Sequence, residues 1–365
     1  MSESLSFKWY SFFSPNRWKI ISSSLVVLIS LSGLYVRFQS FNHRDLTPDE
    51  YYHLNYMVDK SFWDVFKDMP KREFSSYITG HSYVTYPFFK LFGFNKWGLV
   101  IPRIIANILG FLFLYGVCQK FFKTTLGYLV TFILVSFNQN LIWHSFEIRP
   151  YAFLPPLALA VFYFMDMMIA QNRQMSRLKR YALGLFFIFV IWFHPDGVLM
   201  ILFSGLFLWF AQEKQQRSFP AFIYLIKYFS VIFLITMPLW LISVFGPHLA
   251  PYEINVFQYI PNPMYDLKGF LRGVIGNLIS NKSLKFLFAG LFLGFLLPHK
   301  DYFKQVGFFL ILVVLPLEVI LAVHIWNNHW FIQRFFVWII PFFAIFLGWS
   351  FDVMAQLVLT KVKKI

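Results

Sequence analysis

The stretch WGLVIPRIIANILGFLFLYGVC, residues 97–118, decides the fold class of this chain, and its only charged residue is Arg103. An α-helix needs roughly 20 consecutive, mainly apolar residues to cross the hydrocarbon core of a bilayer, and this stretch meets that length. It therefore predicts a transmembrane helix. Whether the chain spans a membrane several times depends on how many further stretches of this kind it holds.

The composition of the whole chain favours a membrane protein. Its 365 residues are 58% hydrophobic and 13% charged, whereas soluble domains carry about 25% charged residues. The formal net charge of +15 would suggest nucleic acid in a soluble protein. In a membrane protein, basic residues mark cytoplasmic loops, so we expect no nucleic-acid partner. The single cysteine, Cys118, excludes an intramolecular disulfide and a cysteine-based metal site.

Apolar segments recur along the chain and predict an all-α, polytopic fold of about ten transmembrane helices. One domain, 1–365, would hold them all, with no separate soluble domain at the C-terminal end. The segment 82–94 is too short to span, so we expect an interfacial helix there. The break at Pro195 and Gly197 leaves two short helices or one re-entrant pair open for 181–211. The predicted spans are 19–38, 97–118, 125–143, 150–170, 181–193, 197–211, 221–245, 284–298, 304–324 and 331–352.

Lysine and arginine are distributed unevenly between the two sides of these spans. With the N-terminus inside, the short outer hairpins near 145, 195 and 327 hold only Arg149 and Arg334. The positive-inside rule then places both termini in the cytoplasm and two longer loops, 39–96 and 246–283, outside. We expect the bacterial inner (plasma) membrane. The inner segments hold Lys8, Arg17, Lys19, Lys120, Lys123, Arg173, Arg177, Lys179, Arg180, Lys214, Arg217, Lys300, Lys304, Lys361, Lys363 and Lys364.

The groups suited to chemistry gather on the outer side. The loop stretch HRDLTPDEYYH (43–53), the hairpins WHSFEIRPY (143–151) and HPDG (194–197), and HIWNNHWFIQR (324–334) all lie there, with every histidine except His299. An ion-coupled transporter should instead keep ionisable residues near the membrane midplane. The pattern favours a site at the outer membrane–water boundary, suited to a substrate with a lipid tail and a polar head.

Each of these residues also has a structural alternative. Thr47 or Asp49 would cap a helix, with Glu50 in its first turn. Asp49 and His53 share a helix face at i, i+4, but two ligands are too few to define a metal site. Arg149 suits a phosphate through its bidentate fork, or its side chain reaches lipid headgroups. The structural alternatives for the remaining candidates are a helix-capping Glu147, a turn at His194 and Asp196, and an interfacial anchor at Arg334.

Four stretches together resemble the GT-C fold glycosyltransferases of the protein O-mannosyltransferase and aminoarabinose-transferase type. They are the acidic pair in LTPDEYYH (46–53), HSYVTYPFFKLFGFNKWGLVIPRIIANILG (81–110), SFEIRPYAF (145–153), and HPDG with QRFFVWIIPFFAIFLGW (333–349). Arg103 matches the family's arginine at the start of the second span. The matches run in the family's order from 45 to 349.

The resemblance implies an outer-face glycosyltransferase, of the hexosyl- or pentosyltransferase class, acting on cell envelope glycans. Its donor would be a polyprenyl-phosphate sugar, and its acceptor a lipid, a glycan or a protein. Asp49 would be the general base, with Glu50 beside it. Arg149 and Arg103 would bind the donor phosphate or support the site. The weaker candidates for the site are Arg334, Arg44, His53, His81, Glu147, His194 and Asp196.

Neither the residues nor the resemblance requires a cofactor, and a divalent metal ion between Asp49 and His53 stays an alternative. Two other functions remain open at this point. One is a lipid-linked glycan flippase or other transporter. The other is a membrane protein of the same fold without catalytic activity.

Overall fold

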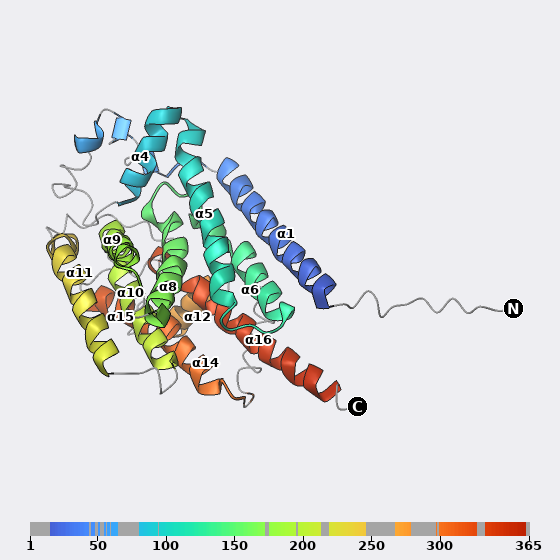
Figure 1. Cartoon of the computed structure of the whole chain (residues 1–365). Coiled ribbons are helices and arrows are strands. Elements are labelled where there is room, and N and C mark those ends of the chain that lie inside the picture. The colour runs from blue at the N-terminus through green and yellow to red at the C-terminus, as the bar shows by residue number, and fades with distance from the viewer. Residues whose placement is uncertain are drawn as a thin grey trace.

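The computed structural model describes most of the chain as helices that pack into a bundle (Figure 1). At some helix ends, including 333–335, it describes the backbone alone. All elements among the described residues are helical, which confirms the all-α fold class. The described residues are 15–43, 45–47, 50–51, 55, 57–58, 60–64, 80–93, 95–171, 175–194, 196–212, 219–245, 267–278, 297, 299–326 and 333–362.

Four of the described helices contain segments long and apolar enough to cross a membrane: Ser23–Asn42, Trp97–Cys118, Tyr302–Ala322 and Phe336–Thr360. They lie in α1 (Pro15–Asn42), α5 (Lys96–Cys118), the continuous run α14 (Tyr302–Phe309), η6 (Leu310–Val314) and α15 (Leu315–Trp326), and the pair η7 (Gln333–Ile339) and α16 (Ile340–Val362). The chain is therefore a polytopic membrane protein. The other elements are α4 (Gly80–Phe92), α6 (Thr125–Phe137), α7 (Gln139–His144), η3 (Pro150–Ala152), α8 (Leu154–Gln171), α9 (Arg177–Phe193), α10 (Asp196–Ala211), α11 (Phe219–Phe245) and α12 (Leu267–Leu278).

Most predicted spans match a helix, but the structure differs from the prediction at 125–143 and at the end of the last span. The segment 125–143 is split, because Asn138 ends α6 and its side chain accepts the N–H groups of Asn140 and Leu141 to begin α7. The region 181–211 holds two helices, α9 and α10, as the predicted spans 181–193 and 197–211 require, and the two pack against each other. The last helix runs to Val362 instead of ending at 352. Of the predicted span 284–298, only residue 297 lies among the described residues.

The path of the chain gathers three loops at one end of the bundle. Helix α5 starts at this end, α6 returns to it, and the loop 145–149 follows α7. After α8 leaves, α9 returns and places the turn 194–196 there, while α4 lies across the same end (Figure 1). We call this end the α4 end. The parts of 81–92, 143–151 and 194–197 that the structure describes therefore share one end of the molecule, whereas α12 of the predicted outer loop 246–283 lies away from it (Figure 1).

Helix α16 forms the centre of the bundle and packs closely on α6. Gly348 of α16 lies against α6, where an added Cβ would sit 2.7 Å from the Gly127 carbonyl oxygen and would overlap the hydroxyl of Thr131. Around this contact, aromatic rings fill the core, among them Phe121, Phe308 and Trp349. The absence of a side chain at Gly348 allows the two helix backbones to approach.

Replacing Gly348 by alanine should therefore lower the melting temperature of the protein in detergent. Overpacking of a filled core costs about 1–3 kcal/mol, which outweighs the gain of about 1 kcal/mol in helix propensity. Gly307→Ala is the matched control, because a Cβ on this helical glycine meets nothing within 4 Å. Equal melting temperatures for the two variants would contradict close packing of α16 on α6.

Candidate functional site

The first part of the candidate site is the turn that contains Thr47 and Glu50. The backbone N–H of Glu50 donates to the Thr47 hydroxyl oxygen (3.3 Å), and a Glu50 carboxylate oxygen accepts the backbone N–H of Thr47 (2.8 Å). This reciprocal pair is a capping box, which satisfies two backbone donors at the start of a helix. Of the two caps that the sequence allowed, Thr47 is the one observed.

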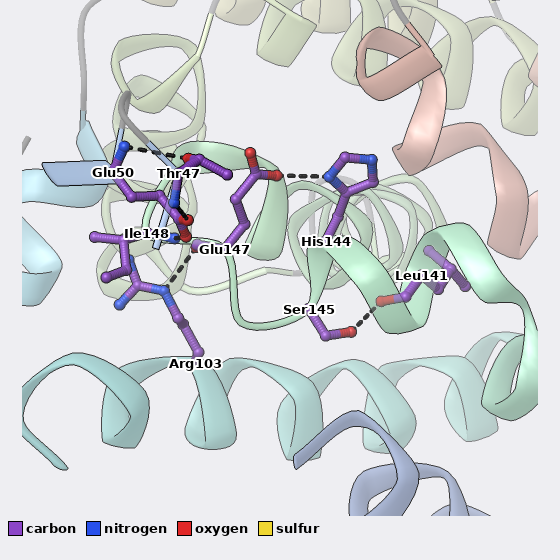
Figure 2. Close-up of polar contacts among 8 residues, drawn as sticks. All are labelled: Thr47, Glu50, Arg103, Leu141, His144, Ser145, Glu147 and Ile148. Carbon is purple, nitrogen blue, oxygen red and sulfur yellow. Dashed lines mark hydrogen bonds and ion pairs between the residues drawn. The ribbon is translucent and has the colours of Figure 1, made fainter. Parts of the chain in front are cut away.

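Glu50 also joins this turn to the loop 145–149. Its other carboxylate oxygen accepts the backbone N–H of Ile148 at 2.7 Å, and the side chain is fully buried. Figure 2 shows the carboxylate between the two chain segments. The acidic-pair stretch and SFEIRPYAF, nearly a hundred residues apart in sequence, are thus adjacent. Because both oxygens accept backbone N–H groups, Glu50 is placed to position the loop.

Arg103 supports the same loop from helix α5. Its Nε donates to the backbone carbonyl of Glu147 at 2.8 Å (Figure 2). An Nη donates to the carbonyl of Leu99 one turn earlier. The side chain is fully buried, and its guanidinium lies 5.6 Å from the centre of the Phe153 ring. These contacts make Arg103 part of the hydrogen-bond network around the loop 145–149, while its predicted role in the site stays a prediction.

Glu147 faces His144 on the other side of the loop. The His144 Nδ1 lies 2.5 Å from a Glu147 carboxylate oxygen, and the side chains are 12% and 7% exposed (Figure 2). Since a carboxylate accepts, this nitrogen carries the proton, as the hydrogen-bond pattern assigns it. The two residues are three apart, and Glu147 thereby orients the imidazole. His144 belongs to a stretch that the sequence singled out, but the residue itself was overlooked.

Tyr151 connects this pair to the second hairpin. Its buried ring packs edge-on against His144 and against His194, at 6.1 and 5.9 Å between ring centres. The guanidinium of Arg149 lies 5.4 Å from the centre of the same ring. Two imidazoles and one guanidinium thus surround one phenol. Tyr151 was not among the predicted site residues.

His194 and Asp196 form the turn between α9 and α10, just before the apolar segment 197–211. The His194 Nδ1 accepts the backbone N–H of Asp196 (3.3 Å) and lies 3.5 Å from its carboxylate. Burial raises the pKa of the Asp196 carboxyl to about 7, while the indole of Trp338 opposes the shift. A carboxyl with such a pKa changes charge near neutral pH, at the end of the bundle that carries the other candidate residues.

The raised pKa of Asp196 predicts a pH-dependent effect of the Asp196→Asn variant. The folded protein holds the proton more tightly than the unfolded chain, whose aspartate titrates at 3.8. Stability is therefore lost as pH rises from 3.8 toward 7, by about 2–3 kcal/mol between pH 5 and pH 8. Asparagine does not ionise, so the stability of the variant lacks this pH dependence. The melting temperature of the variant minus that of the wild type should therefore be larger at pH 8 than at pH 5. The same difference at both pH values would contradict this titration.

His81 lies close to the second hairpin. It is fully buried near the start of α4, and its neighbour Gly80 lies so close to Phe193 that an added Cβ would be 2.6 Å from the Phe193 Cα. Phe193 directly precedes His194. The described candidates Glu50, Arg103, His81 and His194 therefore belong to one end of the bundle, together with Glu147, Arg149 and Asp196.

With this geometry described, the chain can be compared with known proteins. The chain is similar to ArnT. The crystal structure of ArnT from Cupriavidus metallidurans bound to undecaprenyl phosphate matches 93% of this chain, with a TM-score of 0.48 and 15% sequence identity. This chain covers 61% of the ArnT chain. No protein-family model and no curated protein matches the sequence.

Arg37 is a buried cation that the sequence-based prediction overlooked. It lies in the apolar segment of α1, where it donates to the side-chain oxygen of Asn107 (2.9 Å) and to the backbone carbonyl of Val135 (2.6 Å). Its guanidinium is 5.0 Å from the centre of the Phe111 ring. No carboxylate among the described residues contacts it. An arginine inside a predicted span is a signal of function, and that signal was available in the sequence.

The contacts of Asn107 connect Arg37 to the candidate site. Its amide nitrogen donates to the carbonyls of Arg103 (2.8 Å) and Ser145 (3.2 Å), while its oxygen accepts from Arg37. A cavity of about 30 Å³ lies beside this network and is lined by Arg37, His144 and Tyr151 among others. The cavity is large enough for one water molecule, and most of its remaining lining is apolar. Buried polar groups thus run from Glu50 to Arg37.

Several predicted residues fall outside what the structure describes. Asp49, Arg44 and His53 lie outside the described residues, and of Arg334 only the backbone is described, in η7. The predicted alternative of a metal ion between Asp49 and His53 thus stays a prediction. Among the residues that were described, no group of three or more His, Cys, Asp or Glu side chains is arranged to hold a metal ion.

Proposed function

We propose that this chain is a membrane glycosyltransferase. It would transfer a hexose or pentose from a polyprenyl-phosphate donor to a lipid, glycan or protein acceptor at the outer face of the bacterial inner membrane. The observation that carries the proposal is the hydrogen bond from Ile148 to Glu50, which brings two of the family-like stretches together. Asp49 directly precedes Glu50 in the chain, and this adjacency supports its assignment to the site.

The proposed reaction is a single displacement at the anomeric carbon of the donor sugar. A new bond forms between an acceptor oxygen and the anomeric carbon, and the bond from that carbon to the phosphate oxygen breaks. The polyprenyl phosphate leaves with the electron pair, and the acceptor proton passes to a carboxylate. We assign that carboxylate to Asp49, and general-base catalysis of this kind contributes about 10²–10⁴-fold to a rate.

The leaving phosphate gains negative charge during this step. A cation beside it stabilises the transition state more than the ground state, and arginine can donate two parallel hydrogen bonds to phosphate. We assign this role to Arg149, which is half-buried in the loop 145–149. It directly follows Ile148, whose backbone N–H donates to Glu50, and Arg103 donates to the carbonyl of Glu147 in the same loop. Arg103 would act as a positioning residue, because it donates to the carbonyls of Glu147 and Leu99.

Transfer from radiolabelled polyprenyl-phosphate sugars in membranes tests the proposal. Membranes that contain the protein should move label from at least one donor to an acceptor and release free polyprenyl phosphate, whereas control membranes should not. The panel should contain hexose and pentose donors, since the proposal leaves the sugar open within these classes. Movement of intact lipid-linked glycan across sealed vesicles, with no transfer from any donor, would favour a transporter instead.

A further inference from the structure

A second pocket lies at the end of the bundle opposite the α4 end. It has a volume of about 260 Å³ and lies between three parts of the chain: the segment between α5 and α6, the turn 299–301 and the C-terminal half of α16. We call it the Lys123–Lys300 pocket after two of its lining residues. The other lining residues are Phe121, His299, Asp301, Trp349, Val353, Gln356, Leu357 and Thr360.

The pocket lies where the apolar part of the bundle ends. The apolar segment of α16 ends at Thr360, which lines the pocket, and that of α5 ends at Cys118, shortly before Phe121. At 1.5 Å per residue, α5 separates this end from the α4 end by about 33 Å, close to the thickness of a bilayer core. The pocket therefore lies at the level expected for the lipid headgroups of the other leaflet.

The rim of the pocket carries two lysines and one aspartate. Lys123 and Lys300 are exposed, and neither has an ion-pair or hydrogen-bond partner for its ammonium group among the described residues. Asp301 is the acidic residue of the lining. Asp352 lies beside the pocket, where its carboxylate accepts the backbone N–H groups of Lys123 (3.0 Å) and Thr124 (2.6 Å). Asp352 thus fixes the backbone of Lys123 at the rim.

His299 adds a further hydrogen-bonding group to the pocket. Its Nδ1 lies 3.0 Å from the carbonyl oxygen of Leu297, so this nitrogen carries the proton and donates. Its Nε2 is buried and has no hydrogen-bond partner among the described residues. A buried ring nitrogen without a partner costs free energy unless a ligand or water satisfies it.

The floor of the pocket is apolar. Phe121, Trp349 and Val353 are largely buried there, while Leu357 at the rim is 37% exposed. A free phosphate ion would gain nothing from such a floor, but the first carbons of an acyl chain would. A basic rim over an apolar floor matches the two ends of an anionic lipid, and basic pockets on the cytoplasmic side of membrane proteins bind such headgroups.

We propose that the Lys123–Lys300 pocket binds an anionic glycerophospholipid. The phosphate lies at Lys123 and Lys300, and the glycerol and the start of an acyl chain lie along Trp349 and Leu357. Lys123 belongs to the segment between α5 and α6, and Lys300 belongs to the turn before α14. A lipid phosphate bound to both lysines would therefore link these two parts of the chain. This site is separate from the proposed transferase site and does not depend on that activity.

Lipid binding by the purified protein in mild detergent tests this proposal. The probes are phosphatidylglycerol, phosphatidylcholine with the same chains, and glycerol 3-phosphate, with native mass spectrometry and melting temperature as readouts. Phosphatidylglycerol should bind and raise the melting temperature, and the other two should not. The variant Lys123→Gln/Lys300→Gln should bind it about 30-fold more weakly, at about 1 kcal/mol for each lysine near an anionic lipid.

The control variant is Lys179→Gln/Lys304→Gln, which removes two exposed lysines from the same end of the bundle but outside the pocket. It should keep the binding of phosphatidylglycerol. Equal losses in the two double variants would show attraction to the general positive charge and would overturn the proposal. Equal binding of phosphatidylcholine, or of glycerol 3-phosphate alone, would overturn it as well.

Discussion

Replacing Asp49 by asparagine should lower sugar transfer by about 10²–10⁴-fold, the range for loss of a general base. Asparagine has nearly the same size and keeps a hydrogen-bonding oxygen, but it cannot take the acceptor proton. The observed cap uses the side chains of Thr47 and Glu50, so the melting temperature should change little. The measurement is the rate of transfer from the labelled donor that the wild type uses best.

Asp45→Asn is the control for this experiment. Asp45 is an exposed residue of the same loop, and its substitution removes the same charge. Transfer by this variant should stay close to that of the wild type. Full activity in Asp49→Asn would remove the assignment of the base. Equal losses in both variants would show that the charge of the loop matters and not one carboxylate.

The Glu50→Gln variant should instead lose stability together with activity. Both carboxylate oxygens of Glu50 accept backbone N–H groups, from Ile148 and Thr47, and a glutamine oxygen can accept only one of them. The amide N–H₂ then faces the second N–H, and an unsatisfied buried donor costs about 1–3 kcal/mol. The loop 145–149 loses its anchor, so the melting temperature in detergent should fall by several degrees along with the transfer rate.

Asp49→Asn is the matched comparison, because it makes the same chemical change one residue earlier in the chain. The melting temperatures should distinguish the two variants. Asp49→Asn should be inactive with nearly the wild-type melting temperature, and Glu50→Gln should be inactive with a lower one. A Glu50→Gln protein with wild-type melting temperature and no activity would assign Glu50 a direct chemical role. In that case the positioning role inferred from its two backbone contacts would be wrong.

Much of the fold could be predicted from the sequence, because apolar length is a local property. Helix α5 begins within one residue of the predicted span and ends at the predicted residue. The prediction was wrong where one side chain changes the local structure. Asn138 breaks an apolar run by capping a new helix. Asp352 stays inside the last helix because backbone N–H groups of residues 123 and 124 satisfy its carboxylate.

The candidate site was predictable in its parts but not in its connections. The Thr47-x-x-Glu50 pattern indicates a cap, and the structure contains it. The contact between Glu50 and Ile148 depends on how α1, α5 and α7 pack, and no local pattern contains that information. The position of Tyr151 between His144 and His194 arises because the two hairpins meet only in the folded bundle. Arg37 could have been predicted, because an arginine inside an apolar span is a signal of function.

The contacts of Arg37 have a consequence for the order in which the chain assembles. The partners of its guanidinium lie on α5 and α6, which are synthesised after α1. An arginine in a lone helix at the centre of a bilayer costs about 2.5–3.5 kcal/mol on the insertion scale, and less near the helix end, where the side chain can reach water. Newly inserted α1 should therefore sit with Arg37 turned toward the headgroups. It would rotate into the bundle only after α6 has entered the membrane, which makes the docking of the first helix a late step of folding.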